Sequence, residues 1–326
     1  MLSSMPTQWS FPAELQPDPQ SWRFDLDAAL DAVVALRAEI PEDAFTAPIL
    51  GTERAGHGVA IGNESLLLTI GYLIAEASSI WLTTNRGAVV AGHSLAYDQN
   101  SGLGLVQALG PLGVRGLERS SAASCAVGDE VIVAGHGGRH HALKATVFAR
   151  REFAGYWEYV LDEAIFTAPA HPHWGGTALI GADGRLLGIG SLLVEEKLDG
   201  ETLQGNMIVP IDVLEPIFDD LRRRGRANRP PRPWLGLYTT EIERHLAVAG
   251  LAPGSPADKA GLAVGDLVLE VAGERVSGLA DLFRRIWRLG AAGVEVPLTL
   301  ARRGESLHLI VKSADRNDFL KKPRLH

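Results

Sequence analysis

From Gly56 to about Ile189, the chain consists of short apolar stretches separated by Gly, Asn, Asp and Ser residues. Many short strands at roughly regular spacing are typical of an all-β sandwich or barrel. No long helices alternate with these stretches, which argues against a doubly wound α/β fold. The pattern therefore predicts a fold dominated by β-strands. The predicted strands are residues 59–61, 66–70, 80–83, 88–91, 103–108, 130–134, 145–149 and 186–189.

The segments on either side of this region predict where the domains end. An apolar run between Asp25 and Glu39 is typical of a short helix that leads into a first strand. Apolar residues recur at helical spacing over Pro210–Arg224, and the glycine that follows favours a helix end there. The three prolines that come next favour a linker, since proline fits neither a helix interior nor a central strand. We therefore predict an N-terminal arm (1–24), a first domain (25–225), a linker (226–233), a second domain (234–316) and a tail (317–326).

Length, charge and cysteine content exclude several classes of protein. The 326 residues suffice for about two domains, and the net charge of −8 argues against nucleic acid or an anionic membrane as a partner. The single cysteine, Cys125, rules out an intramolecular disulfide and fits a reducing compartment. The first residues lack the basic start and apolar stretch of a secretory signal. We therefore expect a cytoplasmic protein that binds neither nucleic acid nor membrane.

The second domain carries a continuous pattern from Leu251 to Val276. Pro256 follows Ser255, which is typical of a capped short helix, because proline in the first turn of a helix costs no hydrogen bond. A Gly-Asp turn then leads into a predicted strand over Leu267–Val271. This pattern resembles the PDZ domain of HtrA-type proteases, which implies a β-domain with two short helices.

A PDZ domain binds an extended peptide, which adds a strand to an exposed sheet edge, while backbone amides hold the terminal carboxylate. The family's carboxylate-binding loop resembles Trp234, Leu235, Gly236 and Leu237. The opposite wall of the groove would be a helix over 281–288. On that helix, Leu282 and Ile286 would face the peptide. In an alternative interpretation, Leu235 and Leu237 are ordinary core residues of a strand, and the first domain closes the groove.

Four landmarks resemble the HtrA/DegP branch of trypsin-like serine proteases. They keep the family's order and spacing across most of the first domain, and the resemblance implies a trypsin-like double β-barrel followed by the PDZ domain. The landmarks are Gly56–Val59, Val127–Val131, Trp174–Gly176 with Gly184–Ile189, and Asn206–Pro210.

The positions that resemble the family's catalytic triad carry other residues. A serine, a histidine and an aspartate perform the chemistry in that family. Here Tyr72 stands at the histidine position, Gly102 at the aspartate position and Trp174 at the serine position. Pro172 stands where a glycine would donate its N–H to the oxyanion hole, and proline has no N–H. The sequence therefore predicts that the chain is not a working enzyme.

Histidines in two loops could offer other chemistry. His136, His140 and His141 lie in one predicted loop, and His171 and His173 lie in the loop that resembles the family's active-site loop. Clustered histidines with a carboxylate can bind zinc. Histidines in glycine-rich loops are more often solvated, so we expect no metal and no cofactor, with a histidine-based hydrolase or metal protein as the remaining alternative.

We therefore predict an HtrA-like pseudoprotease that binds a peptide or a protein terminus as a scaffold, as in bacterial protein quality control. The alternative is an active serine endopeptidase with a rearranged active site. The resemblance also implies a possible homotrimer and a periplasmic location as the alternative to the cytoplasm. Four aromatic residues of the N-terminal region could anchor such a trimer, since aromatics are enriched at interfaces. They are Trp9, Phe11, Trp22 and Phe24.

Overall fold

The computed structural model describes residues 9–62, 65–198, 200–243 and 245–322. The chain divides into two compact units. Unit 1 contains the described residues up to 151 together with 163–227 and 322, and unit 2 contains the described residues of 152–162 and 228–321. A short segment from the middle of the chain therefore belongs to the second unit.

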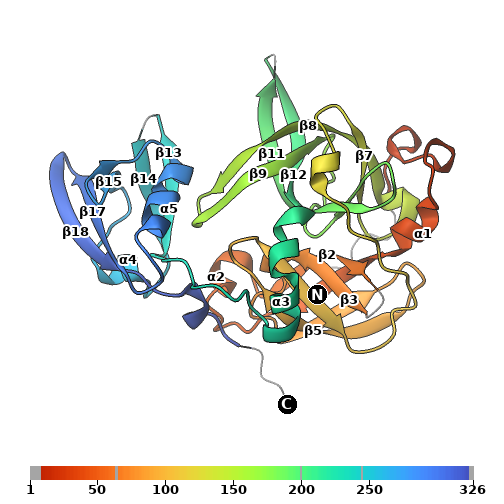
Figure 1. The fold of residues 1–326 in the computed structure, drawn as a ribbon, viewed down its shortest axis with the longest axis horizontal. Helices are drawn as coiled ribbons and strands as arrows, with labels where there is room; N and C mark the ends of the chain where they lie inside the picture. Colours follow the sequence, from red (N-terminus) through yellow and green to blue (C-terminus); the bar gives the residue numbers. More distant parts are fainter. Residues whose placement is uncertain (1–8, 63–64, 199, 244, 323–326) are drawn as a thin grey trace. The chain divides into compact units, whose positions relative to one another are not determined.

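The first half of unit 1, drawn in red to orange in Figure 1, is a closed β-barrel. Its strand order is β1-β2-β3-β6-β5-β4. Helix α1 (Leu26–Asp31) leads into it, and the carboxylate of Asp25 caps this helix by accepting from the amide of Ala28. The expected helix and first strand at this place are confirmed. A short helix, α2 (Ala47–Leu50), joins the first two strands. The strands are β1 (Val33–Glu39), β2 (Glu53–Ile61), β3 (Leu66–Ile70), β4 (Ser79–Thr83), β5 (Val89–Tyr97) and β6 (Leu103–Ala108).

The second half of unit 1 is another closed barrel, with strand order β10-β11-β12-β9-β8-β7. Its interior is filled by apolar side chains of these strands, such as Val133, Leu143 and Ile165. The turn between β8 and β9 lies at 156–158. The strands are β7 (Glu130–Ala134), β8 (Ala142–Gly155), β9 (Tyr159–Ala168), β10 (Ala178–Ile180), β11 (Leu186–Leu198) and β12 (Glu201–Pro210).

The helical segment after β12 is less regular than its sequence pattern predicts. The helix expected over 210–224 divides into two short 3-10 turns and α3 (Phe218–Arg224). Pro216 lies in the second of these turns. Since proline has no N–H for an α-helical hydrogen bond, the regular helix starts only after it. Gly225 ends α3 in the left-handed conformation, as the sequence predicts.

Unit 2 contains a sheet with strand order β13-β14-β15-β17-β18, with β16 paired to β15. Strand β13 is therefore an edge strand among the described residues. Helix α5 (Leu279–Arg288) contacts β13 and β15 and buries Leu282, Phe283 and Ile286. The remaining elements are β13 (Leu237–Ile242), β14 (His245–Leu251), α4 (Pro256–Lys259), β15 (Leu267–Val271), β16 (Glu274–Arg275), β17 (Glu295–Arg302) and β18 (Glu305–Lys312).

Single-turn 3-10 helices complete the described secondary structure. They are 13–15, 19–21, 71–73, 122–124, 138–141, 211–213, 215–217 and 316–318. The prediction of a fold dominated by β-strands, with two barrels followed by a smaller β-domain with two short helices, is confirmed. No helix among the described residues is long and apolar enough to cross a membrane.

Candidate functional site

Tyr72 and Trp174 lie together at the site where the sequence suggests a lost catalytic pair. Tyr72 is in the 3-10 turn directly after β3, and Trp174 is in the loop ahead of β10. The Tyr72 hydroxyl donates to the carbonyl of Ser191 at 2.9 Å, and the Trp174 side chain lies against Tyr72. Burial raises the pKa of Tyr72 well above its ordinary value. Trp174 therefore packs beside Tyr72.

This arrangement gives Tyr72 no means of acting as a base. Its proton is held by a backbone carbonyl, and burial keeps the phenol neutral. A general base must be able to accept a proton near the working pH. Tyr72 is therefore a structural link between β3 and β11 rather than a proton acceptor.

Gly102 lies directly ahead of β6 and has a φ of 76°, a left-handed conformation that glycine adopts without strain. Its carbonyl accepts from the amide of Gly71 at 2.7 Å, which joins it to the turn that carries Tyr72. The nearby Asp98 uses its carboxylate to accept from the amide of Ser101 at 2.8 Å. Asp98 is therefore part of the turn that precedes Gly102.

The loop from His171 to Gly175 is fixed by backbone contacts. The amide of His171 donates to Asn206 at 2.7 Å, and the Asn206 side chain donates back to the His171 carbonyl at 3.1 Å. The carbonyl of Gly175 accepts from the amide of His57 at 2.8 Å. Pro172 contributes no amide N–H to this loop.

A pocket of about 600 Å³ lies beside this loop in unit 1. Trp174 is half-buried at its wall, so its side chain does not fill the whole cleft. Apolar and aromatic groups make up most of the lining, with several histidines among them. The lining includes Trp9, His57, Tyr72, His136, His141, His171, His173 and Trp174.

Both ring nitrogens of His57 are held by backbone groups. Its Nδ1 accepts from the amide of His136 at 3.0 Å, so the ring proton is on Nε2, which lies 3.1 Å from the carbonyl of His173. Burial lowers the pKa of His57 to about 3. His57 is therefore neutral and fully engaged, and it cannot serve as a base for a hydroxyl nucleophile.

His171 is held in the same way. Its Nδ1 accepts from the amide of His173 at 3.1 Å, and its Nε2 donates to the carbonyl of His141 at 3.1 Å. Burial lowers the pKa of His171 to about 4. The expectation that these loop histidines are solvated is wrong for His171, which has no exposed surface, because the rings of Trp9, Phe11 and His57 pack against it. Among the described residues, no cluster of three or more His, Cys, Asp or Glu side chains is arranged to hold a metal ion.

The N-terminal arm packs on the same region of unit 1. Phe11 is buried in the core of the second barrel, and its amide donates to the carbonyl of His140 at 2.9 Å. The ring of Trp9 makes edge contacts with His141, His171 and His173. These two aromatic side chains therefore contribute to the fold of their own domain, in addition to any role between subunits.

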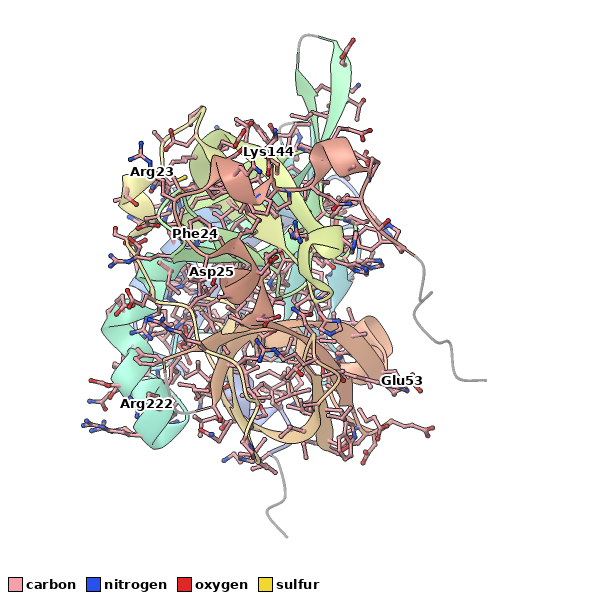
Figure 2. The ribbon with its side chains drawn as sticks, turned by 90° about the vertical axis from the view of Figure 1, so that its right-hand side faces the viewer. Arg23, Phe24, Asp25, Glu53, Lys144 and Arg222 are labelled. Carbon is pink, nitrogen blue, oxygen red and sulfur yellow. The ribbon has the colours of Figure 1, made fainter. Side chains whose placement is uncertain are left out.

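The second pair of aromatic residues lies closer to α1. Figure 2 shows Phe24 between Arg23 and Asp25, at the start of that helix. A methyl group placed on Gly184 would lie 2.5 Å from the Phe24 ring, so the ring packs directly on this glycine. The rings of Trp22 and Phe24 are 5.8 Å apart.

In unit 2, the structure brings together all six residues predicted for the peptide groove. Leu235, Leu237, Leu282 and Ile286 are fully buried members of one apolar core, and Trp234 is buried nearby. Gly236 has a φ of 82°, and an added Cβ would lie 2.2 Å from the Ser255 side chain. Only glycine fits here, which keeps the loop amides in place.

The three successive amides of this loop already bind a carboxylate from the same unit. The side chain of Glu158 accepts from Leu235 at 3.1 and 3.2 Å, from Gly236 at 2.6 Å and from Leu237 at 3.0 Å. Glu158 is only 5% exposed, and burial raises its pKa to about 7 against the opposing effect of these amides. Nothing in the sequence pattern singles out Glu158, since its role depends on where the β8–β9 turn lies.

Comparisons with known proteins agree with the two folds. Residues 56–189 match the trypsin-like peptidase domain family, and residues 248–302 match the PDZ domain family. The chain is 18% identical to the solved HtrA-type protease AlgW with decapeptide, at a TM-score of 0.53, with 92% of this chain and 100% of that chain covered. The serine endoprotease from Yersinia pestis gives a TM-score of 0.51 at 18% identity, with 90% of this chain and 98% of that chain covered.

Curated relatives give the same classification. A probable periplasmic DegP-like serine endoprotease of Halomonas elongata is 32% identical over 163 residues, which are 46% of this chain and 33% of the relative. Another from Hahella chejuensis is 25% identical over 279 residues, covering 80% of this chain and 57% of the relative. The chain therefore combines a trypsin-like peptidase domain with a PDZ domain in an HtrA-type fold, and DegP and HtrA proteins are its homologues.

The matched region covers only part of each of these curated relatives. The chain spans between a third and just over half of the first curated relatives. Their names place them in the periplasm, which matches the alternative location considered from the sequence. The comparisons do not support the expected cytoplasmic location.

Proposed function

We propose that this chain is an HtrA-like pseudoprotease, a protein that keeps the protease fold without its catalysis and uses its PDZ domain to bind peptides or protein termini. The observation that carries the proposal is the contact between Tyr72 and Trp174. The resemblance to the family implies a catalytic histidine and serine at these two positions. Two side chains that cannot transfer a proton between them occupy those places.

The chemistry of peptide hydrolysis supports this proposal. A serine protease needs a nucleophile, a base within about 3 Å of it, and amides that stabilise the oxyanion. Trp174 has no nucleophilic oxygen, Gly102 has no carboxylate and Pro172 has no N–H. Two buried histidines near the pocket, His57 and His171, have both ring nitrogens occupied by backbone groups.

The names of the relatives favour a second candidate, an active serine endopeptidase. DegP-like relatives are named serine endoproteases, and they share the peptidase fold. Activity here would require a nucleophile and a base at positions other than Tyr72, Gly102 and Trp174. Degradation of unfolded casein, with and without a serine-hydrolase inhibitor, distinguishes the two candidates.

The expected result is no cleavage above background in the wild type. A Trp174→Ala variant is the matched control, since it alters the suspected site without adding a nucleophile, and we expect no cleavage from it either. Inhibitor-sensitive cleavage that survives repurification would contradict the pseudoprotease proposal.

The PDZ domain supplies the binding function in this proposal. The domain family matches residues 248–302, and the edge strand β13 lies beside helix α5, the two walls between which such domains bind peptides. The solved AlgW structure is described as having a decapeptide. Binding of decapeptides with free terminal carboxylates, measured by fluorescence polarisation, tests this part. Equal binding of carboxylate and amidated peptides would contradict recognition of a terminal carboxylate.

Homotrimer formation belongs to the same proposal and follows from the family resemblance alone. Light scattering of the purified full chain tests it, and a monomer at every concentration would contradict it.

A further inference from the structure

The carboxylate-binding loop of unit 2 is occupied by a side chain of its own unit. Both oxygens of Glu158 accept from the Leu235 amide, and one of them also accepts from Gly236 and Leu237. Successive amides around a left-handed glycine form a concave site that favours an anion. The carboxylate of Glu158 therefore lies where a terminal carboxylate would bind.

The backbone beside Glu158 also takes the place of a peptide. The amide of Thr239, on the edge strand β13, donates to the carbonyl of Tyr156 at 3.2 Å. A peptide that extends the sheet would use the same outward-facing amides of β13. The ring of Tyr156 lies 6.0 Å from that of Tyr238 on the same strand.

The apolar side chain of Val160, two residues after Glu158, lies where a side chain of a bound peptide would pack. Val160 is buried in the core cluster that contains Leu235, Leu282 and Ile286. One short segment thus supplies a carboxylate for the loop amides, a carbonyl for the edge strand and an apolar side chain for the groove. These are the three contacts that peptide recognition by strand addition uses.

Ion pairs hold this segment in place on both sides. Arg284, on helix α5, pairs with Asp162 at 2.5 Å and also with Glu152. These two carboxylates come from the two arms of the β8–β9 hairpin, so one guanidinium bridges them. Glu158 itself has a φ of 61°. This left-handed conformation is energetically unfavourable for any residue that carries a Cβ atom. The buried contacts of its carboxylate offset that cost.

We propose that residues 156–160 are a built-in competitor for the peptide groove, so that a peptide with a free terminal carboxylate binds only after Glu158 leaves the loop. This inference rests on the proposed peptide binding by the PDZ domain. A tethered ligand competes at a high effective concentration. Only molecules with an open groove can bind a free peptide, so the apparent affinity equals the intrinsic affinity multiplied by the open fraction. Releasing the segment should therefore raise peptide affinity without adding any contact to the peptide.

The test compares the wild type with Glu158→Ala in the full chain. The probe is a set of labelled decapeptides that end in an apolar residue with a free carboxylate, each paired with its amidated form. Glu305→Gln is the control, because Glu305 is an exposed carboxylate of the same unit in β18. We expect Glu158→Ala to bind the carboxylate peptides at least about tenfold more tightly. The control should bind them as the wild type does.

A milder variant guards against loss of folding in Glu158→Ala. Arg284→Gln removes the bridge between the hairpin arms and leaves the loop amides and Glu158 unchanged. We expect it to tighten peptide binding by a smaller factor. Equal affinities in wild type, Glu158→Ala and Arg284→Gln would overturn the competitor proposal.

Hydrogen exchange separates this proposal from the proposed function. In the wild type the amides of Leu235, Gly236 and Leu237 should be protected, and Glu158→Ala should lose that protection while the rest of the sheet keeps it. Unprotected loop amides in the wild type would refute the internal contact even if peptides bind. Protected amides that open in Glu158→Ala, with no peptide bound by either protein, would keep the contact but refute both peptide binding and competition.

Discussion

Docking of the Glu158 side chain into the loop of residues 235–237 should depend on pH. The environment of this carboxyl predicts both the direction and the magnitude of that dependence. Burial raises the pKa of this carboxyl from 4.5 to about 7. The docked carboxyl thus holds its proton more tightly than the released one, so docking is strongest below pH 4.5 and weakens as the pH rises to about 7. A difference of about 2.5 pKa units corresponds to about 3 kcal/mol.

This linkage predicts tighter peptide binding at higher pH. Between about pH 5 and pH 8, the equilibrium constant for docking of Glu158 should fall roughly 70-fold. As long as most molecules are still docked, the apparent peptide affinity should rise by up to the same factor. A terminal carboxylate, with a pKa of about 3.5, stays ionised across this range. Arg316 is a charged neighbour of this carboxyl, and burial raises the pKa of the adjacent Tyr238 above its ordinary value, so Tyr238 does not titrate in this range.

Fluorescence polarisation with one labelled carboxylate peptide, at constant ionic strength, measures the effect. Glu158→Gln is the matched variant, because it keeps the size of the side chain and removes its titration. A wild-type affinity that stays flat or falls from pH 5 to pH 8 would contradict the proposed linkage between docking and the protonation of Glu158. An identical pH profile in Glu158→Gln would also refute it.

Two further predictions concern unit 1. Burial lowers the pKa of His57 from 6.5 to about 3, so the unfolded state binds the proton more tightly than the folded state does. The contribution of the neutral ring to the free energy of unfolding should be complete above pH 6.5. It should be lost as the pH falls toward 3, by up to about 5 kcal/mol. Urea unfolding at several pH values measures this loss, and a His57→Gln variant with an unchanged acid profile would contradict it. Phe11→Ala should lower the free energy of unfolding by about 3 kcal/mol, because it leaves a cavity in the core of the second barrel. Leu109→Ala is the control: its side chain is 67% exposed, so the loss should be less than about 0.5 kcal/mol. Denaturant unfolding compares the two, and equal losses would show that the N-terminal arm does not contribute to the core.

Most strands of the first barrel, and some strands of the second barrel and of unit 2, could be predicted from the sequence because their signals are local. Strands β9, β10 and β12 are not among the predicted ones. Short apolar stretches bounded by turn residues predict the barrel strands, and the Ser-Pro start predicts α4 with its Ser255 cap. The helix over 210–224 was only partly predictable, since helical periodicity does not show where Pro216 interrupts the hydrogen bonds.

The environment of individual side chains was much harder to predict. A glycine-rich loop suggests solvated histidines, yet His171 is buried because backbone groups of other segments satisfy both its ring nitrogens. Glu158 carries no local signal at all. Its burial arises because the β8–β9 turn meets a loop that lies 77 residues further along the chain. Such contacts depend on tertiary arrangement, which periodicity and turn residues do not encode.

The most direct test of the account remains the peptidase assay on the full chain. Purified protein at high concentration is incubated with unfolded casein, with and without a serine-hydrolase inhibitor, beside the Trp174→Ala variant. We expect no cleavage above background in any of these reactions, because Tyr72 and Trp174 lie together at the positions that the family resemblance assigns to the base and the nucleophile. Inhibitor-sensitive cleavage by the wild type that persists through repurification would contradict it.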